Sequence, residues 1–257
     1  MKHKITYTAL LSSLAILSTS VFADDDGRDR NACKNLPSQA EVKTALSAAR
    51  NSPNGGFNLD MWGAVVNRDG VVCAVAFTGA DRGEQWPGSR VISAQKANTA
   101  NAFSLPGLAL STANLYSAVQ PGGSLFGLSD SNPVDTSVAY QGPSARYGSS
   151  NDPMVGKKIG GINVFGGGLA LYNSSGALLG AIGVSGDSSC ADHNIAWKTR
   201  RSLDLDHVPA GVSPTNADDN IIYDINASGQ SPSGFGHPAC TPESTNIAQA
   251  FNKAGTN

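Results

Sequence analysis

The chain has 257 residues, and its 18 lysines and arginines nearly balance 20 aspartates and glutamates, giving a formal net charge of −2. Charged residues make up 15% of the sequence, against about 25% in an average globular domain. The sequence has no lysine or arginine cluster, which excludes nucleic acid as a partner, because phosphate neutralisation requires a basic patch. The composition also excludes a disordered chain, a coiled coil and a polytopic membrane protein.

The N-terminal segment has the pattern of a secretory signal peptide over residues 1–23. Lys2 and Lys4 form a basic start, an apolar stretch follows at 9–17, and small or apolar residues at 21–23 suit cleavage. The stretch is too short for a transmembrane anchor, which needs about 20 mostly apolar residues. We therefore expect an exported protein, periplasmic or secreted, without a membrane span.

Four cysteines lie beyond the predicted signal peptide, namely Cys33, Cys73, Cys190 and Cys240. An even number in an oxidising compartment predicts two disulfides. The spacing contains no C-x-x-C element, which argues against a zinc site or a redox pair. Of the three possible connectivities we favour Cys33–Cys73 with Cys190–Cys240, because each bond would tie a terminal extension to the central domain.

The first predicted elements follow a polar N-terminal arm at residues 24–35. Ser38 and Glu41 have the spacing of a capping box, which predicts a helix that runs to about Arg50. An Asn- and Gly-rich break comes next. Two β-rich runs with a short turn between them then predict a hairpin, at Met61–Val66 and Val71–Phe77.

Helices, strands and a long loop alternate in the rest of the chain. Apolar spacing predicts a helix over residues 89–103 and a shorter one over 108–119. Residues 129–160 are dominated by Ser, Asn, Asp, Pro and Gly, which indicates a long polar insertion of the kind that is usually functional or mobile. Three strands and a last helix are predicted after it, at 162–165, 169–172, 177–185 and 191–205.

This order of elements predicts an α+β fold, an antiparallel sheet with helices packed on it, in one domain at residues 36–205. The strand at 177–185 is apolar and built of small residues, as expected for a central strand packed on both faces. Residues 206–257 are rich in Asn, Ser, Pro and Gly and form a C-terminal extension that Cys240 would hold.

Five segments of the central domain together carry a family resemblance. They include Ala94–Ala100, Gln120–Leu128 with its Pro-Gly-Gly corner, and Phe165–Leu169 with Gly166-Gly167-Gly168, and they are completed by residues 63–76 and 180–186. In this order they resemble the GlcG/HbpS-like haem-binding family. The resemblance implies a profilin-like fold with a five-stranded antiparallel sheet, a tendency to form homo-oligomers, and haem binding in some exported members. The insertion, the cysteines and the long tail depart from the family pattern.

Lys96 is the first candidate for ligand binding. It shares a helical stripe with Ile92, Thr99 and Phe103 that should face inward. A desolvated lysine there would meet a carboxylate or a haem propionate. The alternative is a lysine that extends along the helix edge to water.

The other candidates are glycine corners and aromatic side chains. Glycine corners let a chain or ligand approach closely, and no helix start follows them that would cradle a phosphate. Aromatic rings would form an apolar wall for a porphyrin, although core packing explains them equally well. With Lys96 and His193, the candidate cofactor-binding set comprises Thr99, Phe103, Phe126, Phe165, Gly166 and Gly167.

Haem iron takes His, Met, Tyr or Cys as an axial ligand, and three histidines follow the signal peptide. His193 is the first candidate for the metal because it lies at the start of the last helix, beside the presumed pocket. His207 and His237 lie in or next to the tail and rank lower. The adjacent Asp192 would form a metal pair with His193, although no second convergent ligand is evident.

These observations favour an exported haem-binding protein, with haem as the expected cofactor, acting in sequestration, delivery or sensing. The alternatives are an enzyme acting on a small hydroxy- or oxo-acid, with Lys96 as its acid–base or carboxylate-binding group, and an accessory protein of a periplasmic dehydrogenase. We expect a binding protein rather than an enzyme. Ser185 does not fit a hydrolase elbow, because the G-x-S-x-G pattern is incomplete.

Overall fold

The predicted hairpin forms one side of an antiparallel sheet in the computed structural model, which describes residues 32–251. Its strands are β1 (Trp62–Asn67) and β2 (Val72–Phe77). β1 also pairs with β4 (Leu178–Ser185), which pairs with β3 (Gly168–Tyr172), so the strand order is β2-β1-β4-β3. The predicted signal peptide lies outside the described residues, as does most of the polar arm.

The sheet has four strands rather than the five that were expected. The prediction of a strand at 162–165 is wrong, because this segment bonds to a helix instead of a neighbouring strand. Asn163 N–H donates to Thr99 Oγ1 at 2.9 Å, and Asn98 Nδ2 donates to Gly161 O at 2.8 Å. Gly160 and Gly161 both have positive φ, so the chain turns just before it reaches the sheet. The α+β class itself is confirmed.

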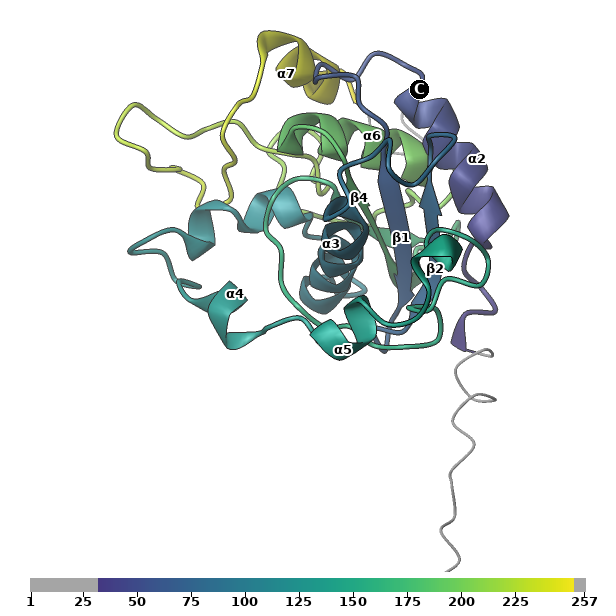
Figure 1. The fold of residues 1–257 in the computed structure, drawn as a ribbon. Helices are drawn as coiled ribbons and strands as arrows, with labels where there is room; N and C mark the ends of the chain where they lie inside the picture. Colours follow the sequence, from purple (N-terminus) through teal and green to yellow (C-terminus); the bar gives the residue numbers. More distant parts are fainter. Residues whose placement is uncertain (1–31, 252–257) are drawn as a thin grey trace, which may run out of the picture.

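Helices cover both faces of the sheet (Figure 1). α3 (Ser89–Phe103) packs on one face, with the bounds that its apolar stripe predicts. α2 (Gln39–Arg50) and α6 (Ser189–Ser202) pack on the other. The capping box predicted for α2 is present, since Ser38 Oγ accepts Glu41 N–H and the Glu41 carboxylate accepts Ser38 N–H.

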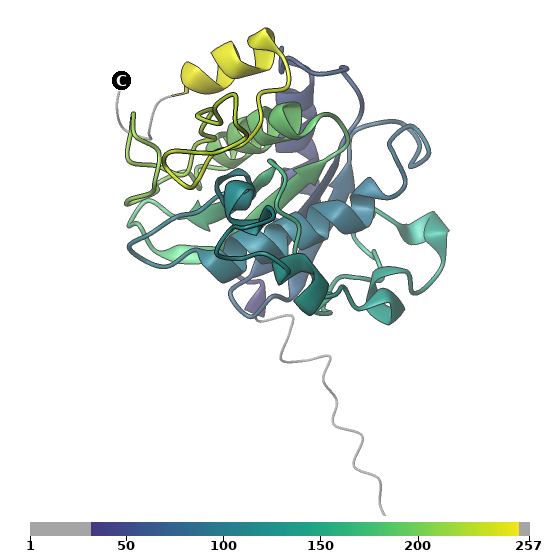
Figure 2. The same cartoon turned by 90° about the vertical axis from the view of Figure 1, so that its left-hand side faces the viewer.

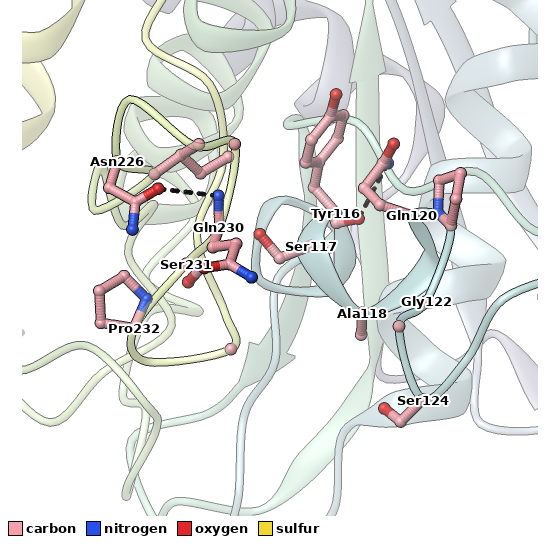
Figure 3. A pocket seen from close by; sticks show the side chains of 15 residues that line it. Tyr116, Ser117, Ala118, Gln120, Gly122, Ser124, Asn226, Gln230, Ser231 and Pro232 are labelled. Atoms are coloured by element: carbon pink, nitrogen blue, oxygen red, sulfur yellow. Dashed lines mark hydrogen bonds between the residues drawn. The ribbon is translucent and has the colours of Figure 1, made fainter.

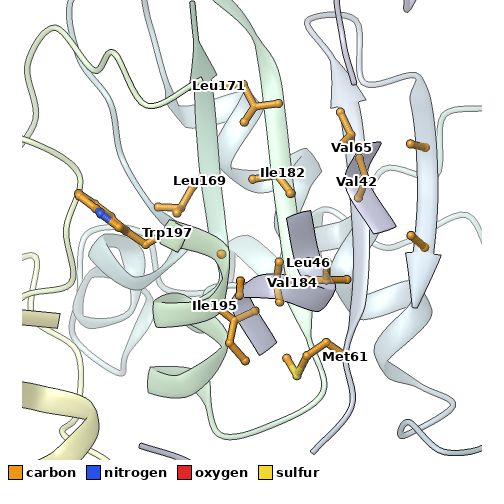
Figure 4. Close-up of a cluster of buried hydrophobic side chains, with 14 residues drawn as sticks. Val42, Leu46, Met61, Val65, Leu169, Leu171, Ile182, Val184, Ile195 and Trp197 are labelled. Carbon is orange, nitrogen blue, oxygen red and sulfur yellow. The ribbon is translucent and has the colours of Figure 1, made fainter. Parts of the chain in front are cut away.

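Two hydrophobic cores result, one on each face of the sheet. Figure 4 shows the core between the sheet and α2 with α6, which includes Leu46, Ile182 and Trp197. The other core lies under α3 and uses smaller side chains, such as Ala94, Ala97 and Ala181. Alternate residues of the two central strands, β1 and β4, therefore enter opposite cores, as the period of a β-strand requires.

The predicted insertion is held to the domain by a buried ion pair. It contains α4 (Leu128–Ser131), α5 (Thr136–Ala139) and the 3-10 turn η3 (Ser144–Arg146). The Arg90 guanidinium of α3 binds the Asp152 carboxylate through Nε at 2.9 Å and through Nη2, and it lies 3.6 Å from the centre of the Tyr147 ring. Met154 and Ile159 are buried in the core beneath α3, so the end of this segment is part of the packed structure.

Two 3-10 turns replace the short helix predicted at 108–119, η1 (Thr112–Leu115) and η2 (Ser117–Val119). Ser111 and Asn114 cap the first turn reciprocally, which satisfies the backbone without a longer helix. These turns lead into the Pro-Gly-Gly corner.

The C-terminal extension folds back over α6 and ends in α7 (Pro242–Gln249), as Figures 1 and 2 show. Arg200 of α6 and Asp219 of the extension form a buried two-pronged ion pair, with Nη···Oδ distances of 2.7 and 2.8 Å. Both predicted disulfides are confirmed, Cys33–Cys73 and Cys190–Cys240. Within residues 32–251 no helix has the length and apolar character that crossing a bilayer would require.

Candidate functional site

The Gly166-Gly167-Gly168 corner lies against a buried ion pair between α3 and α6. Lys96 is 2% exposed, and its Nζ donates to Asp192 Oδ2 at 2.7 Å and to Val184 O at 3.1 Å. A Cβ on Gly167 would lie 3.1 Å from Lys96 Nζ and 2.3 Å from Val184 O, and the φ of Gly167 is +117°. Only glycine fits here. We call Lys96, Asp192, Gly166, Gly167 and His193 the corner cluster.

Lys96 therefore faces inward, as its helical stripe predicts, and it does not extend to water. It meets a carboxylate, but one supplied by this chain. Burial raises the pKa of Asp192 to about 6, against the opposing effect of the Lys96 ammonium group. The other carboxylate oxygen accepts Asp187 N–H at 2.8 Å, so the pair is satisfied inside the protein.

His193 stands next to Asp192 in the first half of α6 and is fully buried. Its Nε2 lies 3.2 Å from Asn220 Oδ1 and 3.2 Å from Ile221 N, both in the C-terminal extension. Nδ1 has no hydrogen-bond partner. Burial lowers the pKa of His193 to about 3, so the ring is neutral at neutral pH.

His237 of the extension is the second buried imidazole, and it is 2% exposed. Its Nδ1 lies 2.7 Å from Pro238 O, whereas Nε2 is buried without a partner. Burial lowers its pKa to about 4, and nearby Lys96 acts in the same direction. The His237 ring lies 5.1 Å from the ring of Tyr116, which is 6.3 Å from that of Phe165.

A cavity of about 610 Å³ opens beside Tyr116. One wall is the segment 116–124 with the Pro-Gly-Gly corner, and the other is the segment 225–234 of the extension. Figure 3 shows Ser117 on the first wall facing Gln230 and Ser231 on the second. All of the lining side chains are uncharged, so the cavity offers one aromatic ring, hydroxyls, amides and exposed backbone.

The remaining sequence-predicted residues are spread around this region. Thr99, one turn from Lys96, is buried and holds Asn163. Phe165 is about half exposed beside Tyr116. Phe103 is half-buried at the end of α3, two turns beyond Lys96, and Phe126 is 67% exposed and does not line the cavity. His207 Nε2 lies 2.9 Å from Asp204 Oδ1 in a separate turn after α6.

Sequence reasoning missed two parts of the site, Tyr116 and the 225–234 wall. Tyr116 lies in the segment 108–119, for which the sequence predicts a helix. The residue pattern of this segment does not indicate which way the Tyr116 ring points. The 225–234 segment was assigned to the tail. Its one signal was Cys240, because a disulfide to Cys190 brings the tail to the start of α6.

The part of the chain that carries the corner cluster is similar to a known protein family. A family model described as haem degrading protein HbpS-like matches residues 38–200. The comparison with curated proteins gives no match. The match over 38–200 contains the sheet, α2, α3 and all but the last two residues of α6, and it leaves out the C-terminal extension.

Three solved structures illustrate the likeness. A PduOC:heme complex is 21% identical, with a TM-score of 0.45, and the match covers 65% of this chain and 91% of that one. Protein ORFY of Klebsiella pneumoniae is 23% identical, with a TM-score of 0.43 and coverages of 65% and 90%. A double mutant of HbpS from Streptomyces reticuli is 17% identical, with a TM-score of 0.42 and coverages of 77% and 99%.

Proposed function

Because the chain belongs to the HbpS-like family over residues 38–200, we propose that it is an exported haem-binding protein that sequesters, delivers or senses haem. The family membership is the observation that carries this proposal. Two further expectations rest on the same resemblance, a profilin-like topology and assembly as a homo-oligomer.

The cavity has a suitable volume for a small-molecule ligand, and the groups that would hold haem iron lie behind its lining. The cavity of about 610 Å³ lies within the range of roughly 300–1,000 Å³ that is usual for small-molecule sites. Tyr116 in the lining and Phe165 next to it supply aromatic surface. His193 and His237 are buried outside the lining, and each keeps one unpartnered ring nitrogen. Neutral imidazole is a common axial ligand of haem iron. Bound haem would supply the iron chemistry, while the protein supplies the donor atom and the walls.

Lys96 has a positioning role in this proposal. Its amine is committed to Asp192 and Val184, so it fixes the glycine corner and the start of α6 rather than a propionate. The propionates of haem carry negative charge, and the cavity lining carries no charged side chain. The lining therefore offers hydroxyl, amide and backbone N–H donors to the propionates rather than a cationic side chain.

The same contacts favour haem binding over an enzyme for small hydroxy- or oxo-acids. That alternative needs the Lys96 amine to reach a substrate, but the amine is buried in an ion pair.

A role as an accessory protein of a periplasmic dehydrogenase would use the insertion and the tail as contact surfaces. Both segments are packed against the domain, through Arg90–Asp152 and Arg200–Asp219.

Export is supported by the predicted signal peptide and by the two disulfides, since such bonds persist in oxidising compartments. Expression with the full N-terminus, followed by N-terminal sequencing of the protein recovered outside the cytoplasm, tests this part. We expect a mature start at Asp24. Recovery only in the cytoplasm, with residues 1–23 intact, would contradict it.

A haemin titration of the chain from Asp24 to Asn257, followed by absorbance, tests the function. We expect a saturable Soret band with about one haem per chain or per dimer. A spectrum that matches haemin mixed with an inert protein would refute haem binding. A thermal-shift panel of small hydroxy- and oxo-acids would then test the enzyme alternative.

A further inference from the structure

Two buried histidines each have a free ring nitrogen, Nδ1 of His193 and Nε2 of His237. Resting on the proposed haem binding, we propose that His237 is the axial ligand of the haem iron. The donor would then come from the C-terminal extension, outside the residues 38–200 that match the family model.

The hydrogen bonding of His237 is that of a ligand histidine. Nδ1 lies 2.7 Å from Pro238 O, which can only accept, so Nδ1 carries the proton. Nε2 is then an acceptor with a lone pair and no partner. Metal-ligating histidines almost always donate their other ring N–H to a carbonyl or a carboxylate, which fixes the tautomer and the ring orientation. An unpaired buried acceptor is otherwise unfavourable, and bound iron would satisfy it.

His237 is buried and does not line the cavity, but its ring contacts a residue that does. Tyr116 lines the cavity and lies against the His237 ring, 5.1 Å between centroids, so movement of this partly exposed side chain would open a route to the imidazole. The preceding residue is anchored to the same wall, because Ser117 Oγ donates to Gly236 O at 2.6 Å. Cys240, three residues after His237, is fixed to Cys190 at the start of α6. The imidazole is therefore held from both sides.

His193 is less suited to this role. Its Nε2 is hydrogen-bonded in either neutral tautomer, as the donor to Asn220 Oδ1 or as the acceptor of Ile221 N–H, which leaves only Nδ1, the nitrogen next to the ring carbon that carries Cβ. Gly166 packs against its Cβ, since an added Cβ there would lie 3.1 Å away. Trp197 lies 6.1 Å from the ring, on the same helix. Neither histidine lines the cavity, but the ring beside His237 is Tyr116, which does line it, whereas the ring beside His193 is Trp197, which does not.

The test compares His237→Gly with His193→Ala in haemin titrations of the chain from Asp24. We expect His237→Gly to weaken haemin binding by at least about tenfold, the lower end of what even an outer-shell partner of a ligand histidine contributes. Its Soret band should lose the signature of a nitrogen ligand, and added imidazole should restore that signature by filling the space left by the side chain. His193→Ala should keep the wild-type band. Circular dichroism and thermal melts of both variants confirm that they are folded.

The outcomes separate the ligand assignment from the proposed function. A wild-type protein that leaves the haemin spectrum unchanged overturns both. A wild-type protein that binds haemin, with a folded His237→Gly variant that has the same band and affinity, overturns only the assignment of His237. Loss of the band in folded His193→Ala, with retention in His237→Gly, would move the ligand to α6.

Discussion

At the scale of single residues, the buried titratable groups make the stability of the protein depend on pH. His193 and His237 have pKa values lowered to about 3 and about 4 by burial, whereas an unfolded histidine titrates near 6.5. As pH falls below about 6.5, the unfolded chain binds protons that the folded chain does not, so the free energy of unfolding decreases. Asp192 acts oppositely, because its raised pKa of about 6 lets the folded chain take up a proton first.

A variant isolates the histidine contribution. We expect His237→Gln to reduce the loss of stability between pH 7 and pH 5 by roughly 2 kcal/mol, at about 1.4 kcal/mol per pKa unit. Urea unfolding at the two pH values measures this difference. An equal loss in the wild type and in His237→Gln would contradict the account.

For single residues, the sequence predicted which way a side chain faces, but it did not predict which groups that side chain binds. The stripe shared by Lys96 and Thr99 correctly indicates that Lys96 faces inward. Its partner Asp192 lies 96 residues away, and no local pattern connects the two. His237 lies in a segment without periodicity, so its burial depends on how the tail packs.

At the scale of elements, the close approach of α3 to the sheet depends on Gly183 in β4. A Cβ at this position would lie 1.9 Å from Ser93 O and 2.5 Å from Ala97 N, both backbone atoms of α3 that have little room to yield. We expect Gly183→Ala to lower the free energy of unfolding by about 3 kcal/mol, the upper end of typical overpacking. Chemical denaturation measures it. Gly107→Ala, where an added Cβ meets nothing within 4 Å, is the matched control, and comparable effects of the two variants would refute the argument.

Elements with a local signature were predictable from the sequence. The bounds of α3 and the capping box of α2 follow from spacing within one helix, and the hairpin follows from two β-rich runs with a short turn between them. The false strand at 162–165 has a comparable apolar run, but its backbone bonds to side chains of α3. Whether a short apolar run forms a strand therefore depends on which hydrogen-bonding groups lie next to it in the fold, and the run itself does not contain that information.

At the scale of the whole molecule, the two disulfides fix the first described residues and the C-terminal extension to the domain in different ways. Cys33–Cys73 joins the start of the described chain to β2, with a sequence separation of 40. Cys190–Cys240 closes 50 residues and fixes the tail that carries His237 and α7 to the first turn of α6. The tail is otherwise held by polar contacts such as Arg200–Asp219 and by the stacking of Phe251 on Trp197, with ring centroids 5.3 Å apart.

Removal of either bond should cost stability, but only one should loosen the tail. We expect Cys33→Ala/Cys73→Ala and Cys190→Ala/Cys240→Ala each to lower the free energy of unfolding by roughly 2–5 kcal/mol, because each loses a cross-link that restricts the unfolded chain. Hydrogen exchange distinguishes them, since locally opening segments exchange fastest. In Cys190→Ala/Cys240→Ala, exchange should rise over residues 222–251 and stay unchanged in α3. The same rise in Cys33→Ala/Cys73→Ala would mean that the tail follows the stability of the whole domain rather than its own cross-link.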